Sequence, residues 1–199
     1  MNFYISIYGF RGFIKLLVNK LRTILFYPNS RLIRFPIDIR NRHLIDFGNG
    51  LTTGVGCRIE AYDVDKDYKK KICFGKNVQI NDFVHIAAGK RVNIGNNVLI
   101  ASKVYISDIN HGFYNGLNPD SPYILPSLRR LHSNVVEIED NVWIGESVTI
   151  LPGVKIGFGS IIGANSIVTR NVPAKSIVVG NPAKIIKSYN DSTKVWDII

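Results

Sequence analysis

The sequence has 199 residues, of which 46% are hydrophobic, so it is long enough for one domain with an extension. Its 25 Lys and Arg residues against 15 Asp and Glu residues give a formal net charge of +10. Most of this surplus lies in residues 1–42, which excludes a nucleic-acid-binding face over the whole domain. Two cysteines, without a CxxC pair or a His/Cys cluster, predict free thiols in a reducing compartment such as the cytoplasm.

Residues 7–26 are predicted to form an amphipathic helix. Apolar side chains recur along one face at spacings of three and four: Ile7, Phe10, Ile14, Leu17, Leu21 and Ile24. Arg11, Lys15 and Arg22 fall on another face, and Lys20 also interrupts the apolar stretch, so a membrane span is not expected. Two interpretations stay open: the helix packs on its own domain or on a neighbouring subunit, or residues 1–26 rest on an anionic membrane surface.

A six-residue period runs through the rest of the chain. The clearest series consists of Ile138, Ile144, Ile150, Ile156, Ile162 and Val168, with a second series two residues earlier at Val136, Val142, Val148 and Val154. This period fits neither an α-helix nor a long alternating strand. Each unit makes a very short strand, and the Gly, Asn, Asp or Ala that follows allows a sharp turn. The sequence therefore predicts an all-β protein, a parallel β-helix of about five triangular coils.

Interruptions of the period predict where loops leave the coils. The spacing from Ile59 to Phe74 exceeds six residues by nine, that from Ile86 to Ile94 by two, and that from Ile106 to Ile138 by 26. These gaps come at every third unit, so all insertions are expected at one corner of the prism. The longest, residues 107–134, carries His111 and is predicted to be a functional loop. We expect an arm and linker over 1–42, the repeat domain over 43–187 and a tail over 188–199.

The run NVWIGESVTILPGVKIGFGSIIGANSIVTRNVPAKSIVVGNPAKIIK, residues 141–187, resembles the hexapeptide-repeat acyltransferases without a gap. Within that family the sequence is most similar to acetyl-CoA-dependent sugar O-acetyltransferases, including galactoside, maltose and polysaccharide O-acetyltransferases. The resemblance covers about residues 43–187. It implies a left-handed β-helix, a homotrimer, and active sites between neighbouring subunits.

The resemblance also implies the reaction. We expect transfer of an acetyl group from acetyl-CoA to a sugar hydroxyl, in capsule, lipopolysaccharide or exopolysaccharide synthesis, in the cytoplasm or at the inner face of its membrane. The alternatives are acetylation of a small soluble acceptor, such as a sugar nucleotide, serine or an antibiotic, and a non-catalytic structural β-helix. The zinc enzymes that share this fold need three histidines, and that spacing is missing around His111, so no metal is expected.

His111 matches the catalytic histidine of the family and is the candidate general base. Asp108, three residues earlier, either orients the His111 ring or caps the loop, and a backbone carbonyl is another candidate partner. Asn81 matches an asparagine that lies near the acceptor in the family.

Residues expected to bind CoA also follow from the resemblance. They lie near the acetyl and pantetheine groups or near the nucleotide and its phosphates: Trp143, Gly145, Gly163, Ala164, Thr169, Arg170 and Lys187. The family often has a small hydroxyl residue directly after the sequence WIG, near the thioester oxygen. Glu146 occupies that position here, so a side-chain donor to the oxyanion is missing from the pattern, and a backbone N–H is the remaining candidate.

Overall fold

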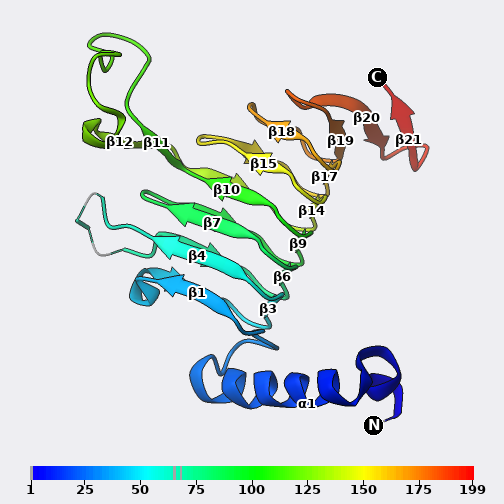
Figure 1. Ribbon diagram of the computed structural model, residues 1–199. Helices are drawn as coiled ribbons and strands as arrows, with labels where there is room; N and C mark the ends of the chain where they lie inside the picture. Colours follow the sequence, from blue (N-terminus) through cyan, green and yellow to red (C-terminus); the bar gives the residue numbers. More distant parts are fainter. Residues whose placement is uncertain (1, 65, 68) are drawn as a thin grey trace.

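The computed structural model describes residues 2–64, 66–67 and 69–199, and they form a stack of β coils with a helix across its N-terminal end (Figure 1). The chain winds through three flat sheets in turn, which we call faces A, B and C. Face A contains β3 (Thr52–Thr53), β6 (Gln79–Ile80), β9 (Leu99–Ile100), β14 (Trp143–Ile144), β17 (Ile161–Ile162), β19 (Ser176–Val179), β20 (Lys184–Asn190) and β21 (Val195–Ile198). All these strands pair in parallel up to β19.

Faces B and C complete the triangular cross-section. Face B contains β1 (Ile37–Arg40), β4 (Cys57–Ala61), β7 (His85–Ala88), β10 (Tyr105–Ser107), β15 (Thr149–Ile150) and β18 (Ile167–Val168). Face C contains β2 (Ile45–Asp46), β5 (Ile72–Phe74), β8 (Val92–Ile94), β13 (Val136–Ile138) and β16 (Lys155–Ile156). The predicted parallel β-helix is therefore confirmed. β1, which the sequence placed in the linker, already pairs with β4, so the coils begin before residue 43.

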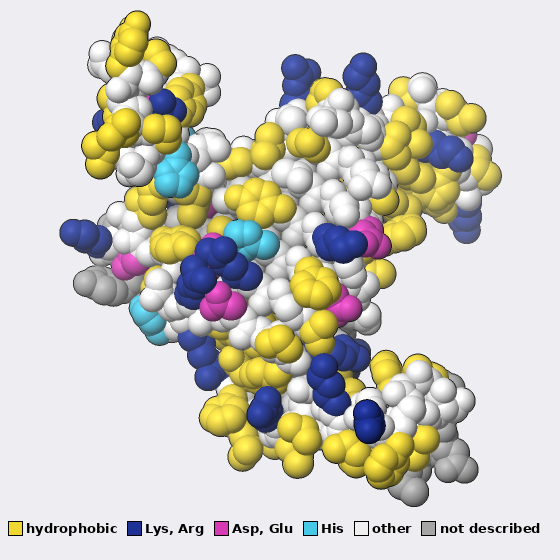
Figure 2. Space-filling model, in the orientation of Figure 1, with side chains coloured by type: hydrophobic (Ala, Val, Ile, Leu, Met, Phe, Trp, Pro, Cys, Tyr) yellow, Lys and Arg dark blue, Asp and Glu magenta, His cyan; other side chains and the backbone are white. Residues whose placement is uncertain are grey.

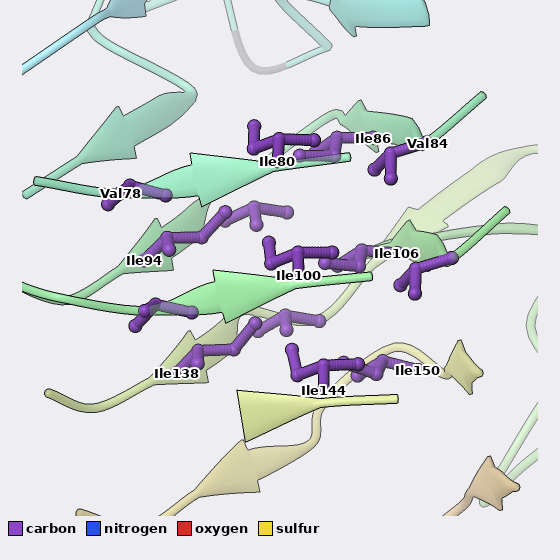
Figure 3. Close-up of a cluster of buried hydrophobic side chains, with 14 of the residues drawn as sticks. Val78, Ile80, Val84, Ile86, Ile94, Ile100, Ile106, Ile138, Ile144 and Ile150 are labelled. Carbon is purple, nitrogen blue, oxygen red and sulfur yellow. The ribbon is translucent and has the colours of Figure 1, made fainter. Parts of the chain in front are cut away.

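The six-residue period produces a continuous aliphatic column inside the prism. Ile80, Ile100 and Ile144 stack on face A, with Ile106 and Ile138 among the residues that face them from the other two sheets (Figure 3). All five are at most 2% exposed, as are most members of the two predicted series. No single coil could remove these side chains from water alone, so the stack stabilises itself through contacts between neighbouring coils.

The corner between faces C and A is built from asparagines. Asn77, Asn97 and Asn141 have φ of 56°, 56° and 59°, a left-handed conformation that asparagine tolerates better than most residues. Their side chains bond along the stack: Asn77 Nδ2 donates to Asn97 Oδ1 at 3.3 Å, and Asn97 Nδ2 donates to Asn141 Oδ1 at 3.2 Å. This ladder holds consecutive coils in register.

The insertions leave the stack at the corner between faces B and C, as the spacing predicts. They connect β4 to β5, β7 to β8 and β10 to β13. After the longest of them the chain returns in register, because Val136 pairs with Val92 and Ile138 with Ile94. One corner of the prism thus carries every irregular segment between these strands, which leaves the other two corners free to stack closely.

Helix α1 (Asn2–Phe26) lies across the N-terminal end of the stack, with a kink at Gly9, whose φ is 66° (Figure 1). Thr23 is fully buried, and its hydroxyl accepts the N–H of Ile33 at 2.8 Å. Asn19 Oδ1 accepts the N–H of Phe35 at 3.4 Å. The polar side chains of α1 therefore bond to the backbone of the first coil.

The predicted apolar face of α1 points away from the coils. Its six members are 44–69% exposed: Ile7, Phe10, Ile14, Leu17, Leu21 and Ile24. The helix does pack on its own domain, but it does so mainly through a different face. Over the described residues, no helix is both long and apolar enough to cross a bilayer.

The C-terminal segment leaves the parallel pattern. β19 pairs antiparallel with β20, and β20 pairs antiparallel with β21, so residues expected in the tail extend face A. Tyr189 and Trp196 pack edge to face across this hairpin, with their ring centroids 5.3 Å apart. Both cysteines, Cys57 and Cys73, are free thiols, as predicted.

Candidate active site

The longest insertion folds into an antiparallel hairpin that presents His111. β11 (Ile109–His111) pairs with β12 (Leu131–Ser133), and His111 lies opposite Leu131. Between these strands the chain is held by internal bonds, including Phe113 N–H to Asp120 Oδ2 at 2.8 Å and a Tyr114 hydroxyl bond to the His111 carbonyl. His111 is exposed on a segment that is ordered by its own contacts.

Asp108 anchors the base of this hairpin. Its carboxylate is fully buried and accepts hydrogen bonds from three consecutive backbone N–H groups: those of Gly89 at 2.7 Å, Lys90 at 2.9 Å and Arg91 at 2.6 Å. Burial raises the pKa of Asp108, and these three N–H groups act in the opposite direction. The contacts are those of the loop-cap alternative, and they tie the hairpin to the β7–β8 turn one coil earlier.

His111 lines a hollow of about 390 Å³ on the outer surface of face B. Strands β4, β7 and β10 supply most of its floor, and Leu131 joins His111 on the hairpin side. Figure 2 shows basic, acidic and histidine side chains gathered over these strands. The hollow is therefore a charged surface adjoining the candidate base.

At the centre of that surface is Glu60, whose side chain is only 4% exposed. Its carboxylate receives hydrogen bonds from four side chains: Arg40 at 3.0 Å, Arg58 at 2.8 and 3.0 Å, Tyr62 at 2.8 Å and His85 at 2.8 Å. Burial alone would raise the pKa of Glu60, but the bonds from His85, Tyr62 and Arg58 outweigh it and lower the pKa. Burial and the bond to Glu60 raise the pKa of Tyr62. Glu60 is thus ionised at neutral pH.

Asn81 and part of the predicted CoA set share the corner between faces A and B. Backbone bonds stack these positions: Asn81 N–H to Ile100 O at 2.8 Å, and Gly145 N–H to Ile162 O at 2.8 Å. A Cβ at Gly145 would lie 2.6 Å from the Ala164 nitrogen, so glycine is required for the coils to approach there. Because the Gly145 N–H is used in this ladder, it is not free to bind an oxyanion.

A second group of predicted CoA residues follows face A. Trp143 pairs with Ile161, Ile161 with Ile177, and Ile177 with Lys187, so Trp143 and Lys187 lie in one row across four strands. Trp143 is 49% exposed. Gly163 N–H bonds to Val178 O at 2.8 Å in the same ladder. Glu146 is exposed and its carboxylate pairs with Lys103 at 3.2 Å.

Within one chain these groups do not converge on His111. Asn81, Gly145 and Ala164 lie where the chain enters face B, whereas the hairpin leaves from the other end of that face. A face of four or five residues separates them by about 15 Å. Thr169 and Arg170 directly follow β18, at the corner of the hairpin but in a later coil, and both are exposed. The predicted residues therefore fall into separate parts of the surface of the chain.

Sequence reasoning missed the Glu60 cluster. Its members come from β1, β4, β7 and the residue after β4, and no local motif joins them. The signal that could have found it is the stacking register itself, because Arg58 pairs with His85 and Glu60 with Ala87. Within the described ranges, no three His, Cys, Asp or Glu side chains lie close enough together to hold a metal ion.

Comparisons with known proteins identify relatives of the chain. Residues 136–170 match the family model described as bacterial transferase hexapeptide (six repeats). The chain is 49% identical over 191 residues to a putative lipopolysaccharide biosynthesis O-acetyl transferase of Escherichia coli K12, covering 96% of this chain and 95% of that protein.

Solved structures with the same architecture include two sugar acetyltransferases. A maltose O-acetyltransferase from Clostridium difficile 630 has a TM-score of 0.61 and 30% identity, covering 75% of this chain and 73% of that one. A galactoside acetyltransferase in complex with coenzyme A has a TM-score of 0.53 and 33% identity, covering 72% of this chain and 67% of that one. The coils are thus those of the left-handed β-helix that these enzymes share.

Proposed function

Because the chain belongs to the hexapeptide-repeat acyltransferases, we propose that it transfers an acetyl group from acetyl-CoA to a sugar hydroxyl in lipopolysaccharide or related polysaccharide synthesis. The observation that carries this proposal is the placement of His111, on an ordered hairpin beside a polar hollow. The Escherichia coli relative, which matches over almost its whole length, is named for lipopolysaccharide O-acetylation. The galactoside acetyltransferase was solved with coenzyme A, which supports acetyl-CoA as the donor.

In the proposed reaction His111 is the general base. It takes the proton of the acceptor hydroxyl as the hydroxyl oxygen attacks the thioester carbonyl, and it returns the proton to the departing CoA sulfur. Asp108 supports this role indirectly, since its three backbone bonds fix the start of the hairpin. Asp108 is thus not assigned as the partner of the His111 ring. The oxyanion donor must be a group other than the Gly145 N–H, because that N–H is already bonded to the Ile162 carbonyl.

We further propose that the working enzyme is a homotrimer with its sites between subunits. His111 and the corner that carries Gly145 and Ala164 lie about 15 Å apart at opposite ends of face B, so one protomer alone does not bring the base and these CoA residues together. Asn81, the acceptor residue implied by the resemblance, lies at the same corner. A neighbouring protomer would place its own corner between faces A and B, together with the part of face A that carries Trp143, next to the hairpin. The hairpin tip suits such a contact, because Leu117 and Tyr123 are 93% and 95% exposed. Thr169, Arg170 and Lys187 would then bind the nucleotide end of CoA.

The proposed activity is tested by following release of the CoA thiol over sugars, nucleotide sugars and isolated polysaccharide. His111→Ala is expected to lower kcat at least a hundredfold, in line with the loss of a general base. His43→Ala is the matched control, because His43 is exposed on the short helix η1 (Arg42–Leu44), away from the hollow. Near-normal turnover in His111→Ala would contradict the mechanism.

The exposed face of α1 is proposed to rest on the inner surface of the cytoplasmic membrane. Its large apolar side chains point away from the coils, and α1 contains four basic residues, Arg11, Lys15, Lys20 and Arg22, and no acidic residue. That combination favours an anionic lipid surface. A saccharide built on a lipid carrier would then be presented to an enzyme lying at the same surface.

Vesicle sedimentation tests the membrane contact. The double variant Phe10→Ser and Leu21→Ser is expected to lose binding to vesicles containing phosphatidylglycerol while it keeps its fold, since both side chains are more than 60% exposed. Ile198→Ser is the control, because Ile198 is 83% exposed at the C-terminal end of the molecule. Failure of the wild-type protein to bind these vesicles would overturn this part of the proposal.

A further inference from the structure

We infer that the Glu60 cluster on face B is a saccharide-binding subsite that positions the acceptor beside His111. The cluster consists of Arg40, Arg58, Glu60, Tyr62 and His85, with Tyr105 at its edge. This inference rests on the proposed function, because it assigns the acceptor of that reaction to a particular surface. Its ligand class is a hydroxyl-rich sugar ring, and the residues act by binding and orientation rather than by proton transfer.

Glu60 organises the cluster without being available to a ligand. Its side chain is 4% exposed and its carboxylate already accepts from Arg40, Arg58, Tyr62 and His85, so burial leaves little of it open to a ligand. A buried carboxylate with several charged donors fixes those donors in place. Arg58 and His85 remain 42% and 31% exposed at their side chains, so a ligand in the hollow can still reach them.

His85 is held in one orientation by this arrangement. An ionised carboxylate only accepts hydrogen bonds, so the contact of 2.8 Å between His85 Nε2 and Glu60 Oε1 requires a proton on Nε2. Nδ1 is then the remaining polar atom of the ring, and in the neutral ring it is an acceptor for a hydroxyl group. Guanidinium N–H groups of Arg58 supply donors nearby. This pairing of donors and acceptors is suited to a sugar, whose hydroxyls need both.

An aromatic ring beside the polar groups gives the surface a second saccharide-binding property. Tyr105 lies directly across the ladder from His85, and their ring centroids are 5.1 Å apart. Tyr105 is 37% exposed, so part of its ring can lie against the apolar face of a sugar. The hollow of about 390 Å³ is in the range of small-molecule sites.

The polar cluster lies on the coils that precede the hairpin, those of β1, β4 and β7. The same row of face B continues from Arg58 and His85 through Tyr105 to Thr149 and then Ile167. Neutral and apolar side chains thus occupy this row in the later coils, so stacking of the coils does not require charged residues there. Charged groups occur where His111 can reach a bound ligand, since both His85 and His111 line the same hollow.

The inference is tested with His85→Ala, Arg58→Ala and the conservative His85→Gln, assayed on a panel of p-nitrophenyl glycosides. We expect both alanine variants to raise the acceptor KM at least tenfold with less than a threefold change in kcat and in the KM for acetyl-CoA. His85→Gln should recover part of the loss, because its amide can replace one hydrogen bond. His43→Ala again serves as the control.

Binding without chemistry separates this inference from the proposed function. Calorimetric titration of the same glycosides into His111→Ala, with CoA present, measures affinity in a protein that does not turn over. Adding His85→Ala should weaken that affinity at least tenfold. If His85→Ala abolishes glycoside binding but the wild-type protein does not acetylate the glycosides, the proposed function is wrong and the subsite stands. Unchanged acceptor KM and affinity in His85→Ala, or a loss confined to kcat, would overturn the subsite, as would the absence of any glycoside binding.

Discussion

The coils and the His111 hairpin are held together by different forces. In the coils, each Ile or Val contacts its equivalent one turn above and below, so apolar burial repeats along the whole stack (Figure 3). In the hairpin, order comes from polar contacts, and its tip carries nearly fully exposed Leu117 and Tyr123. The rigid part of the molecule therefore supplies a surface, whereas the segment that carries the candidate base is attached by a few hydrogen bonds at one corner.

The largest expected effect comes from breaking the coil. Ile106→Ala removes a fully buried side chain from the column, so the free energy of unfolding should fall by about 3 kcal/mol. Denaturant unfolding measures this loss. Asn115→Ala on the exposed hairpin is the matched control and should change it by less than about 0.5 kcal/mol. Equal losses in the two variants would contradict the distinction between coil and hairpin.

A smaller stability effect, with a functional consequence, is expected at the junction of the two regions. Asp108→Ala leaves three backbone N–H groups of the β7–β8 turn without their acceptor, so stability should fall by about 2 kcal/mol. Since His111 lies three residues later, kcat should fall at least tenfold while the KM for acetyl-CoA is unchanged. Asp108→Asn, which keeps one acceptor oxygen, should lie between. Wild-type kcat in Asp108→Ala would show that the hairpin positions His111 without this anchor.

The smallest expected effect is a pH dependence on face B. The pKa of Glu60 is lower in the folded chain than its ordinary value, so its ionised form stabilises the fold above pH of about 4.3. That contribution disappears as pH falls through the folded pKa. Glu60→Gln should therefore be less stable than the wild type at pH 7, with a difference that shrinks between about pH 5 and pH 3. Thermal unfolding of both proteins across this range measures it, and a difference independent of pH would contradict the assignment.

Sequence could predict the coils because every turn repeats the same requirement. Ile100, Ile144 and Ile162 each need the same buried position on face A, so the period alone gives strand positions and the corner used for insertions. It did not predict the antiparallel strands β20 and β21, because no period extends past the last coil. β1 was missed since its Ile37 and Ile39 alternate as in any edge strand.

The candidate site was less predictable because it depends on contacts between distant positions. His111 as a candidate follows from the resemblance and from its loop, but the sequence does not show that the N–H groups of Gly89, Lys90 and Arg91 lie against Asp108. Glu60 meets His85, which lies 25 positions later in the sequence, only because one full coil with its insertion brings the two side chains together. The residues on the apolar face of α1 were predicted correctly. The direction in which that face points depends on the hydrogen bonds of Asn19 and Thr23 to the first coil, which a hydrophobic pattern does not reveal.

The bonds from Thr23 and Asn19 to the first coil have a consequence for assembly. A stack of parallel strands has two open ends, and an unpaired backbone edge there can add another copy of itself without limit, as amyloid fibrils do. α1 occupies one end by accepting the N–H groups of Ile33 and Phe35, and the antiparallel turn into β20 changes strand direction at the other. Helix α1, whose apolar face points outward, therefore also covers the open edge of the first coil. With both ends closed, one molecule cannot extend the stack of another by strand pairing.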